Sequence, residues 1–251
     1  MKRILAIHAH PDDVEILAGG TVALLAAAGH HVTIATMTSG NCGSAIHTAE
    51  EIAALRLAEA KASADHIGAD YRWVGFSDLR IFNNDASRMQ VTEVIRAARP
   101  DIVLTSAPID YMADHEMTSA LVRDACFAAP IGLYRTDTVN PAPPLSAIPH
   151  LYYMEPITGA EPSGVIPMAD FCVDVTSVFE TKKEMLARHD SQRSWLLKHH
   201  GMDDYLLHME AFTRATGARF GVEFGEAFRR YKGHAYPESP LLELLLGEWI
   251  V

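Results

Sequence analysis

Cysteine is scarce in this sequence, and long apolar runs are missing. The three cysteines, Cys42, Cys126 and Cys172, are scattered over 251 residues. This spacing fits neither a disulfide framework nor a zinc finger, so we expect a reduced, cytoplasmic compartment. No apolar run approaches the roughly 20 residues of a membrane span, and the apolar stretch near the N-terminus is too short for a signal peptide.

Positive charge is also in deficit. Lys and Arg number 21 against 32 Asp and Glu, a formal net charge of −11 with histidine neutral. Because no basic excess is present to neutralise phosphates, nucleic acid is not an expected partner. Hydrophobic residues make up 49% of the chain, as in a globular protein, and the length predicts a single domain over residues 1–251. The 13 histidines are left unexplained and first suggest metal chemistry.

Strand-like and helix-like segments alternate over the first 130 residues. The expected strands are 3–8, 31–37, 71–74 and 101–105, and the expected helices are 16–28, 48–67, 87–98 and 116–127. Such alternation predicts βαβ units. The expected fold class is therefore α/β, a Rossmann-like three-layer α/β/α arrangement with a mainly parallel sheet.

The second half of the chain opens with a Pro-rich connector, Asn140–Pro149. Two further strand-like runs follow, Leu151–Met154 and Phe171–Val175, and we expect them to join the same sheet. From about Thr176 to Tyr231 we expect a helical C-terminal region.

The most informative segment is His10-Pro11-Asp12-Asp13, directly after the first expected strand. A helix entry explains a proline and one aspartate, but it does not explain the histidine or the second aspartate. Ligands in open α/β sheets bind beyond the carboxyl ends of the strands. Histidine and carboxylate are zinc ligands, and a second carboxylate beside them could hold a water. A helix entry and a metal site both stay open at this point.

A second loop, Asp110–His115, follows the strand 101–105 and supplies a further ligand. His115 would reach the same crevice from a neighbouring strand. Catalytic zinc takes three protein ligands and keeps one position open. His10, one of the two aspartates and His115 would satisfy that count.

Residues Ala9–Glu15, AHPDDVE, resemble the signature of the PIG-L/LmbE family of zinc-dependent de-N-acetylases. Further segments resemble other motifs of that family and follow in the same order along the chain. They are Thr38–Gly43, Arg56–Glu59, Gly75–Asp78, Asp114-His115, His189–Gln192 and Gly225–Phe228.

The resemblance implies a set of roles. It implies that His10, Asp13 and His115 bind Zn²⁺, although a site of nitrogen and oxygen ligands also accepts other divalent ions. It implies that Asp12 is the general base, which takes a proton from water and returns it to the leaving amine. For Asp114, beside His115, we predict a role in orienting a histidine or a water.

The resemblance also implies that Arg56 and Asp78 bind substrate hydroxyls. Each has a simpler structural alternative. Arg56 could form only an ion pair with Glu59 on a helix surface, and Asp78 could be a turn residue. His189 could pack within the C-terminal helices or belong to the site.

One position departs from the family pattern. Where the family has a histidine three residues before the metal-binding histidine, this chain has Met112. Methionine cannot stabilise an oxyanion or protonate a leaving group, and the loss of one oxyanion donor costs about a hundred- to a thousand-fold in rate. Tyr111 or His189 could substitute, zinc alone could suffice, or the protein could act on another substrate or be inactive.

The function expected from the resemblance is hydrolysis of an N-acyl group, expected to be acetyl, from a small-molecule amino sugar or its conjugate. Two alternatives stay open: cleavage of a larger amide conjugate, and a non-catalytic zinc- or glycan-binding protein, which Met112 motivates. A homo-oligomer is an expectation from the resemblance only.

Overall fold

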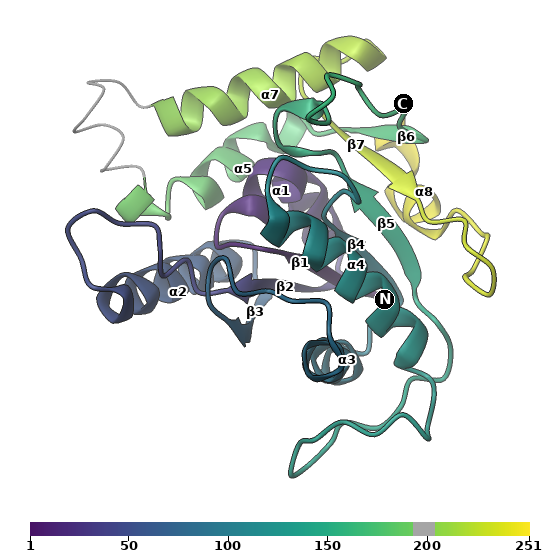
Figure 1. Cartoon of the computed structure of the whole chain (residues 1–251). Helices are drawn as coiled ribbons and strands as arrows, with labels where there is room; N and C mark the ends of the chain where they lie inside the picture. The colour runs from purple at the N-terminus through teal and green to yellow at the C-terminus, as the bar shows by residue number, and fades with distance from the viewer. Residues whose placement is uncertain (193–203) are drawn as a thin grey trace.

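The structure, a computed structural model, describes residues 1–192 and 204–251 (Figure 1). Its strands form one seven-stranded sheet in the order β3-β2-β1-β4-β5-β7-β6. The strands are β1 Arg3–His8, β2 His31–Thr38, β3 Asp70–Phe76, β4 Ile102–Thr105, β5 His150–Met154, β6 Phe171–Asp174 and β7 Gly225–Arg230. Strands β1 to β5 pair in parallel, and β7 runs antiparallel between β5 and β6. The predictions of a mainly parallel sheet, and of later strands that join it, are confirmed.

The helices connect these strands. They are α1 Asp13–Ala27, α2 Ala49–His66, α3 Asp85–Ala98, α4 Ala113–Ala128, α5 Phe179–Leu186, α7 Asp204–Phe220 and α8 Leu241–Leu246, with short 3₁₀ turns at Ile157–Gly159, Thr176–Val178 and Gly247–Trp249. A capping box starts α2: Glu51 N donates to Thr48 Oγ1 at 3.2 Å, and Thr48 N donates to Glu51 Oε2 at 2.9 Å. None of the described helices is long and apolar enough to cross a membrane.

Alternate residues of the central strands belong to two separate hydrophobic cores. Ile4 and Ala6 of β1 belong to a core that includes apolar residues of α1, α5 and α7. Leu5 and Ile7 belong to a second core with α3 and α4. Since successive side chains of a strand point to opposite faces, helices cover both faces of the sheet (Figure 1). The predicted three-layer arrangement follows.

The expected helical C-terminal region is wrong at residues 225–230, which form β7. This strand is paired along both edges, with β5 and β6, and its first four residues are buried one after another, so both of its faces are covered there. Phe228, for example, stacks on Phe171 with ring centroids 5.7 Å apart. A strand covered on both faces lacks the alternation of apolar and polar residues that marks a half-buried strand. Residues 193–203 of the expected helical stretch lie outside the described residues.

A buried ion pair ties β7 and α5 to the middle of α1. Lys182 Nζ donates to Glu226 Oε1 at 2.7 Å and to the carbonyl of Ile16 at 2.8 Å, and both side chains are fully buried. The carboxylate of Glu226 also accepts from the backbone N–H groups of Gly20 and Thr21, at 2.8 and 2.7 Å. The pair therefore fixes the helix whose first turn carries Asp13.

Candidate functional site

The two loops expected to hold metal ligands meet at one edge of the sheet. β1 and β4 are neighbouring parallel strands, so their carboxyl ends lie side by side. α1 and α4 start beyond these ends and pack on opposite faces of the sheet (Figure 1). This is a topological switch point, where open α/β sheets bind ligands. Asp13 lies at the start of α1, and His115 lies in the first turn of α4.

His10, Asp13 and His115 form a compact triangle of donor atoms. Nδ1 of His10 lies 3.3 Å from Oδ2 of Asp13 and 3.3 Å from Nε2 of His115. The third side, from Nε2 of His115 to Oδ2 of Asp13, measures 3.5 Å. A tetrahedral ion with bonds of about 2.0–2.2 Å holds its ligand atoms about 3.3–3.6 Å apart. The three donors therefore fit a four-coordinate divalent ion, and a fourth position would stay open.

His8 is an alternative to His10 as the third ligand of a metal ion. His8, Asp13 and His115 also have donor atoms close enough to hold an ion, and all three are buried. However, Nδ1 of His8 lies only 2.7 Å from Oδ2 of Asp13. That separation is typical of a hydrogen bond and is too short for two atoms bound to the same ion. The geometry therefore favours His10 as the ligand and His8 as a residue that holds Asp13.

Each histidine of the triangle has a carboxylate behind its ring. Asp114 Oδ2 lies 3.1 Å from Nε2 of His10 and accepts a hydrogen bond from the N–H of Leu79 at 2.7 Å. Asp110 Oδ1 lies 3.1 Å from Nδ1 of His115. Such carboxylates commonly orient metal-binding histidines. The sequence reasoning named Asp114 for this role but did not single out Asp110, which no spacing rule distinguishes from other loop aspartates.

The histidines and the carboxylate around the triangle shift one another's pKa values. Burial would lower the pKa of His10, but its hydrogen bonds to Asp114 and Asp13 raise the pKa to about 10. Burial would raise the pKa of Asp13, but the neighbouring His8 and His115 hold it well below its usual range. The carboxylate of Asp13 is therefore ionised, as a metal ligand must be.

Asp12 precedes α1 and has an unusual backbone conformation. It occupies the N-cap position with φ 104°, and its side chain does not cap the helix. Its Oδ2 instead accepts hydrogen bonds from the hydroxyl of Tyr205 at 2.6 Å and from Nη2 of Arg56 at 3.2 Å. Burial raises the pKa of Asp12, and Arg56 opposes that rise. A strained residue beside a cluster of this kind is typical of a functional site.

Arg56 is buried beside the first loop. Its Nη2 donates to the carbonyl of Pro11 at 2.7 Å as well as to Asp12. Gly40 allows this packing, because a Cβ there would lie 2.5 Å from Nε of Arg56 and its φ is +72°. The alternative of an ion pair with Glu59 is wrong, because Arg56 pairs with Asp12 and Glu59 faces another segment.

Glu59 and Asp78 organise the loops around the site. Glu59 accepts hydrogen bonds from the N–H and the hydroxyl of Ser191, both at 2.7 Å. Asp78 is buried and accepts from the N–H groups of Gly40 and Cys42, at 3.0 and 2.8 Å. The contacts recorded for Asp78 thus fix the loop that follows β2. The substrate-binding role of Asp78 stays a prediction.

Tyr111 and Met112 lie next to the triangle at its solvent side. Tyr111 is 65% exposed, and its ring meets that of His115 edge-on, with centroids 5.4 Å apart. Burial of part of the ring and the nearby carboxylates of Asp13 and Asp110 raise the pKa of Tyr111 to about 12, so its hydroxyl keeps its proton. Met112 occupies the N-cap position of α4 without a capping side chain.

His189 lies beneath the site rather than in the triangle. Its Nε2 lies 3.2 Å from Oε1 of Glu15, and this oxygen also accepts a hydrogen bond from the hydroxyl of Ser63 at 2.6 Å. Burial would lower the pKa of His189, but Glu15 and the Asp12 carboxylate raise it. His189 therefore joins the late part of the chain to α1 and α2.

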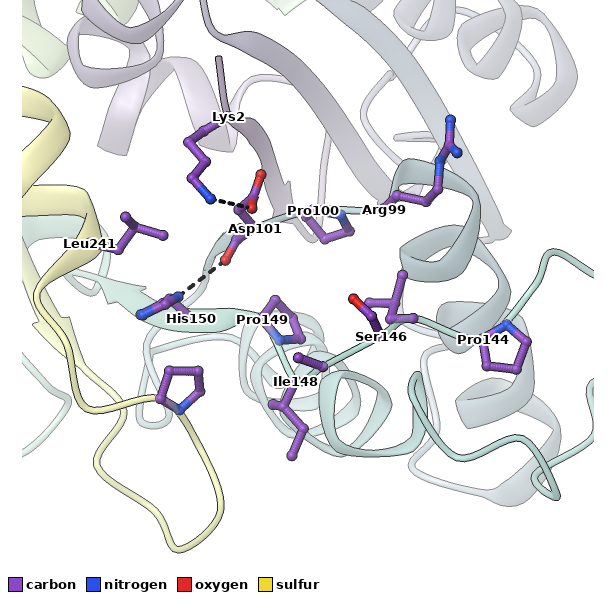
Figure 2. A pocket seen from close by; sticks show the side chains of 13 residues that line it. Lys2, Arg99, Pro100, Asp101, Pro144, Ser146, Ile148, Pro149, His150 and Leu241 are labelled. Carbon is purple, nitrogen blue, oxygen red and sulfur yellow. Dashed lines mark hydrogen bonds and ion pairs between the residues drawn. The ribbon is translucent and has the colours of Figure 1, made fainter.

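A cavity of about 340 Å³ lies at the opposite end of the sheet (Figure 2). It lies where β1, β4 and β5 begin and is partly walled by the Pro-rich connector. Lys2 Nζ pairs with Asp101 Oδ1 at 2.8 Å, and Nδ1 of His150 lies 3.4 Å from the backbone carbonyl of Asp101 (Figure 2). Since this cavity is at the amino ends of the strands, it is separate from the triangle.

Comparison with known proteins matches the first half of the chain to one family. Residues 5–126 match the model of the PIG-L family, described as GlcNAc-PI de-N-acetylase. The matched range contains the His10, Asp13 and His115 triangle and Asp12. This part of the chain, residues 5–126, is therefore similar to the PIG-L family. The predicted resemblance is confirmed, and with it the expected class of amide-cleaving hydrolases.

Two relatives of this chain carry named activities. A diacetylchitobiose deacetylase of Thermococcus kodakarensis is 28% identical over 201 residues, which cover 76% of this chain and 70% of that protein. A 1D-myo-inositol 2-acetamido-2-deoxy-alpha-D-glucopyranoside deacetylase of Rhodococcus erythropolis is 33% identical over 162 residues, which cover 51% of this chain and 55% of that protein.

A solved structure shows that the fold extends over nearly the whole chain. GalB, the 4-carboxy-2-hydroxymuconate hydratase of Pseudomonas putida KT2440, superposes with a TM-score of 0.76. The match covers 95% of this chain and all of GalB at 20% sequence identity. This likeness confirms the α/β fold. Because that protein is a hydratase, the fold alone does not specify the reaction.

Proposed function

We propose that this chain is a zinc-dependent hydrolase that removes an N-acyl group, expected to be acetyl, from an amino sugar or an amino-sugar conjugate. The observation that carries the proposal is the triangle of His10, Asp13 and His115 with Asp12 beside it. The family and the two relatives named for removing acetyl groups from amino sugars support the same reaction.

The donor set favours zinc. Two imidazole nitrogens and one carboxylate oxygen with an open fourth position are typical of catalytic zinc sites. When bound, the ion would supply Lewis acidity, which lowers the pKa of a bound water and polarises the amide carbonyl. Asp114 and Asp110 would keep His10 and His115 in the orientation that binding requires.

Asp12 is the proposed general base. It takes a proton from the attacking water and then returns it to the departing nitrogen, so that the acyl group leaves as a carboxylic acid and the sugar leaves as an amine. Its raised pKa, caused by burial, suits a group that must both accept and release a proton. Arg56 moderates this rise in pKa, because its positive charge favours the ionised form of the carboxylate.

Tyr111 is the proposed substitute for the donor that Met112 cannot supply. Its phenol lies on the loop that precedes His115, and the pKa of about 12 keeps it a hydrogen-bond donor at neutral pH. An oxyanion needs such a donor when the carbonyl carbon becomes tetrahedral. His189, the other possible substitute, is fully buried and paired with Glu15.

The surroundings of the site favour a substrate larger than a single sugar. A cavity of about 330 Å³ is lined by residues 42–45 and Gln192, next to the loop that Asp78 and Arg56 hold. Leu79, whose N–H binds Asp114, has a side chain that is 62% exposed and offers a second, apolar surface. An amino sugar linked to a second group would use both surfaces.

The direct test offers zinc-loaded protein a panel of N-acetylated compounds: N-acetylglucosamine, diacetylchitobiose, an inositol-linked N-acetylglucosamine and an aryl N-acetylglucosaminide. Release of amine and of acetate are both measured. Asp12→Asn should keep its zinc and lose about a hundred- to ten-thousand-fold in turnover. Asp124→Asn is the matched control. Asp124 is a partly exposed residue of α4 that pairs with Arg123, and its replacement should leave turnover unchanged.

The same test separates the proposal from its alternatives. Amine release from matched sugars that carry a larger N-acyl group, with none from the N-acetyl compounds, would indicate cleavage of a larger amide conjugate. Wild-type protein that holds zinc but releases no amine from any compound would contradict the enzyme proposal. Calorimetric binding of those sugars in that case would favour the non-catalytic glycan-binding alternative that Met112 motivates.

A further inference from the structure

A tyrosine from the C-terminal part of the chain contacts the proposed general base. Tyr205 lies in the first turn of α7, 193 residues after Asp12 in the sequence. Its hydroxyl donates to Oδ2 of Asp12 at 2.6 Å, the shorter of the two side-chain hydrogen bonds recorded for this carboxylate. No sequence motif pointed to it, because nothing in the local pattern links residue 205 to the first loop.

The carboxylate of Asp12 is turned away from its ordinary helical partners. An aspartate at an N-cap position usually accepts a hydrogen bond from the N–H of the second or third helical residue. Asp12 has no such side-chain bond, although it occupies the N-cap of α1. The bonds from Tyr205 and Arg56 replace the cap, and both fall on Oδ2. The carboxylate of Asp12 is therefore held by Tyr205 and Arg56 instead of capping α1.

We propose that Tyr205 is a positioning residue for the general base, acting together with Arg56 to fix Oδ2 of Asp12 so that Oδ1 is the oxygen that takes the proton from water. This inference rests on the proposed function of Asp12. Two donors on one oxygen restrict rotation of the carboxyl group, and a base that is already oriented loses less entropy when the reaction begins.

Tyr205 itself transfers no proton in this scheme. The proton of the attacking water goes to Oδ1 of Asp12 and then to the departing nitrogen, while the phenol hydrogen stays on Tyr205. Burial and the adjacent Asp12 carboxylate hold the pKa of Tyr205 well above its usual range, which keeps the hydroxyl a donor throughout. The removal of this hydroxyl should thus slow turnover without removing any reacting atom.

The test compares Tyr205→Phe with Tyr71→Phe. Tyr71 is a matched control, because its hydroxyl lies 2.6 Å from Oγ1 of Thr36, within the sheet. With the best N-acetyl sugar of the wild type, Tyr205→Phe should lower kcat by about 10- to 100-fold. KM should stay within about two-fold, since Tyr205 positions the base rather than the substrate. Zinc content and thermal midpoint should match those of Tyr71→Phe.

Crystal structures of the zinc-loaded wild type and Tyr205→Phe give a readout that does not depend on activity. In the variant, the Asp12 carboxyl group should rotate away from the orientation that Tyr205 holds, toward the first turn of α1. An unchanged orientation of the Asp12 carboxyl group would overturn the positioning role of Tyr205. An unchanged kcat in an active enzyme would also overturn it. If the wild type releases no amine, the proposed function fails, and the two crystal structures alone decide whether Tyr205 orients Asp12.

Discussion

The carboxylate of Asp114 lies 3.1 Å from Nε2 of His10, while the other ring nitrogen, Nδ1, faces Asp13 and His115 at 3.3 Å each. The two nitrogens of one imidazole therefore face different partners. A proton on Nε2, shared with Asp114, leaves the lone pair of Nδ1 free for a metal ion. The N–H of Leu79 fixes the same carboxylate oxygen from outside.

Asp114→Ala should weaken zinc binding by about 10- to 100-fold, because His10 loses the group that sets its tautomer and ring orientation. Competition with a chromophoric chelator measures the affinity directly. Asp124→Ala, also on α4 but engaged with the exposed Arg123, is the control and should bind zinc like the wild type. Equal affinities for both variants would show that Asp114 does not support the metal site.

Replacement of His10 and of His8 should have different effects. His10→Ala removes a donor of the triangle and should abolish tight zinc binding, as should His115→Ala. His8→Ala removes only the group that is 2.7 Å from Oδ2 of Asp13, so zinc should stay bound with about 10- to 100-fold lower affinity. Metal analysis after dialysis distinguishes them. Loss of zinc from His8→Ala with retention in His10→Ala would assign the ligand role to His8 instead.

Zinc affinity should fall as the pH is lowered. In the metal-free protein the pKa of His10 is raised to about 10, so its ring holds a second proton at neutral pH, and the nearby carboxylates of Asp13 and Asp110 also raise the pKa of His115. The ion can bind only when that proton leaves, and affinity therefore decreases about ten-fold per pH unit for each proton released. Calorimetry in buffers of different ionisation enthalpy counts the protons, and a pH-independent affinity between pH 6 and 8 would contradict this assignment.

The buried pair of Lys182 and Glu226 should control stability rather than chemistry. Lys182→Met leaves the Glu226 carboxylate without its cation in a fully buried position, and the expected loss is about 3–5 kcal/mol in the free energy of unfolding. Denaturant titration measures it. The surface change Lys183→Met, at the neighbouring position, should alter the free energy of unfolding by less than about 1 kcal/mol. A comparable loss in both variants would indicate a general defect of α5.

The sequence predicted the sheet and the meeting of the two loops that carry His10, Asp13 and His115, because both depend on local signals. Buried parallel strands such as residues 3–8 and 101–105 form short apolar runs, and the observed β1 and β4 agree with them within one residue. His10, Asp13 and His115 follow these two strands directly. Their meeting therefore follows from parallel pairing, which brings the carboxyl ends of neighbouring strands together.

What could not be predicted depends on contacts between distant segments. β7 inserts between two other strands, and its sequence, GEAFRR, carries no alternation of apolar and polar residues. Tyr205 reaches Asp12 only after the chain has completed most of the sheet. The structural partner of Arg56 could not be predicted either, since spacing along a helix offered only Glu59 as an alternative partner, whereas the folded chain places Asp12 within 3.2 Å. Burial, rather than proximity in sequence, selects these partners.

Substitutions of Tyr111 and Met112 test, by a loss and by a gain of activity, which residue replaces the histidine that the family has at position 112. If Tyr111 supplies the oxyanion donor, Tyr111→Phe should lower kcat by about a hundred- to a thousand-fold, with little change in zinc content. Met112→His, which restores a ring donor at the N-cap of α4, should then recover activity in the Tyr111→Phe background. In the wild-type background it should add little, because a donor is already in place. A large increase in kcat from Met112→His alone, with no decrease from Tyr111→Phe, would show instead that Met112 limits the rate. Tyr111 would then not be the oxyanion donor. Steady-state kinetics on the four proteins, with the same N-acetyl sugar and matched zinc content, decides between these outcomes.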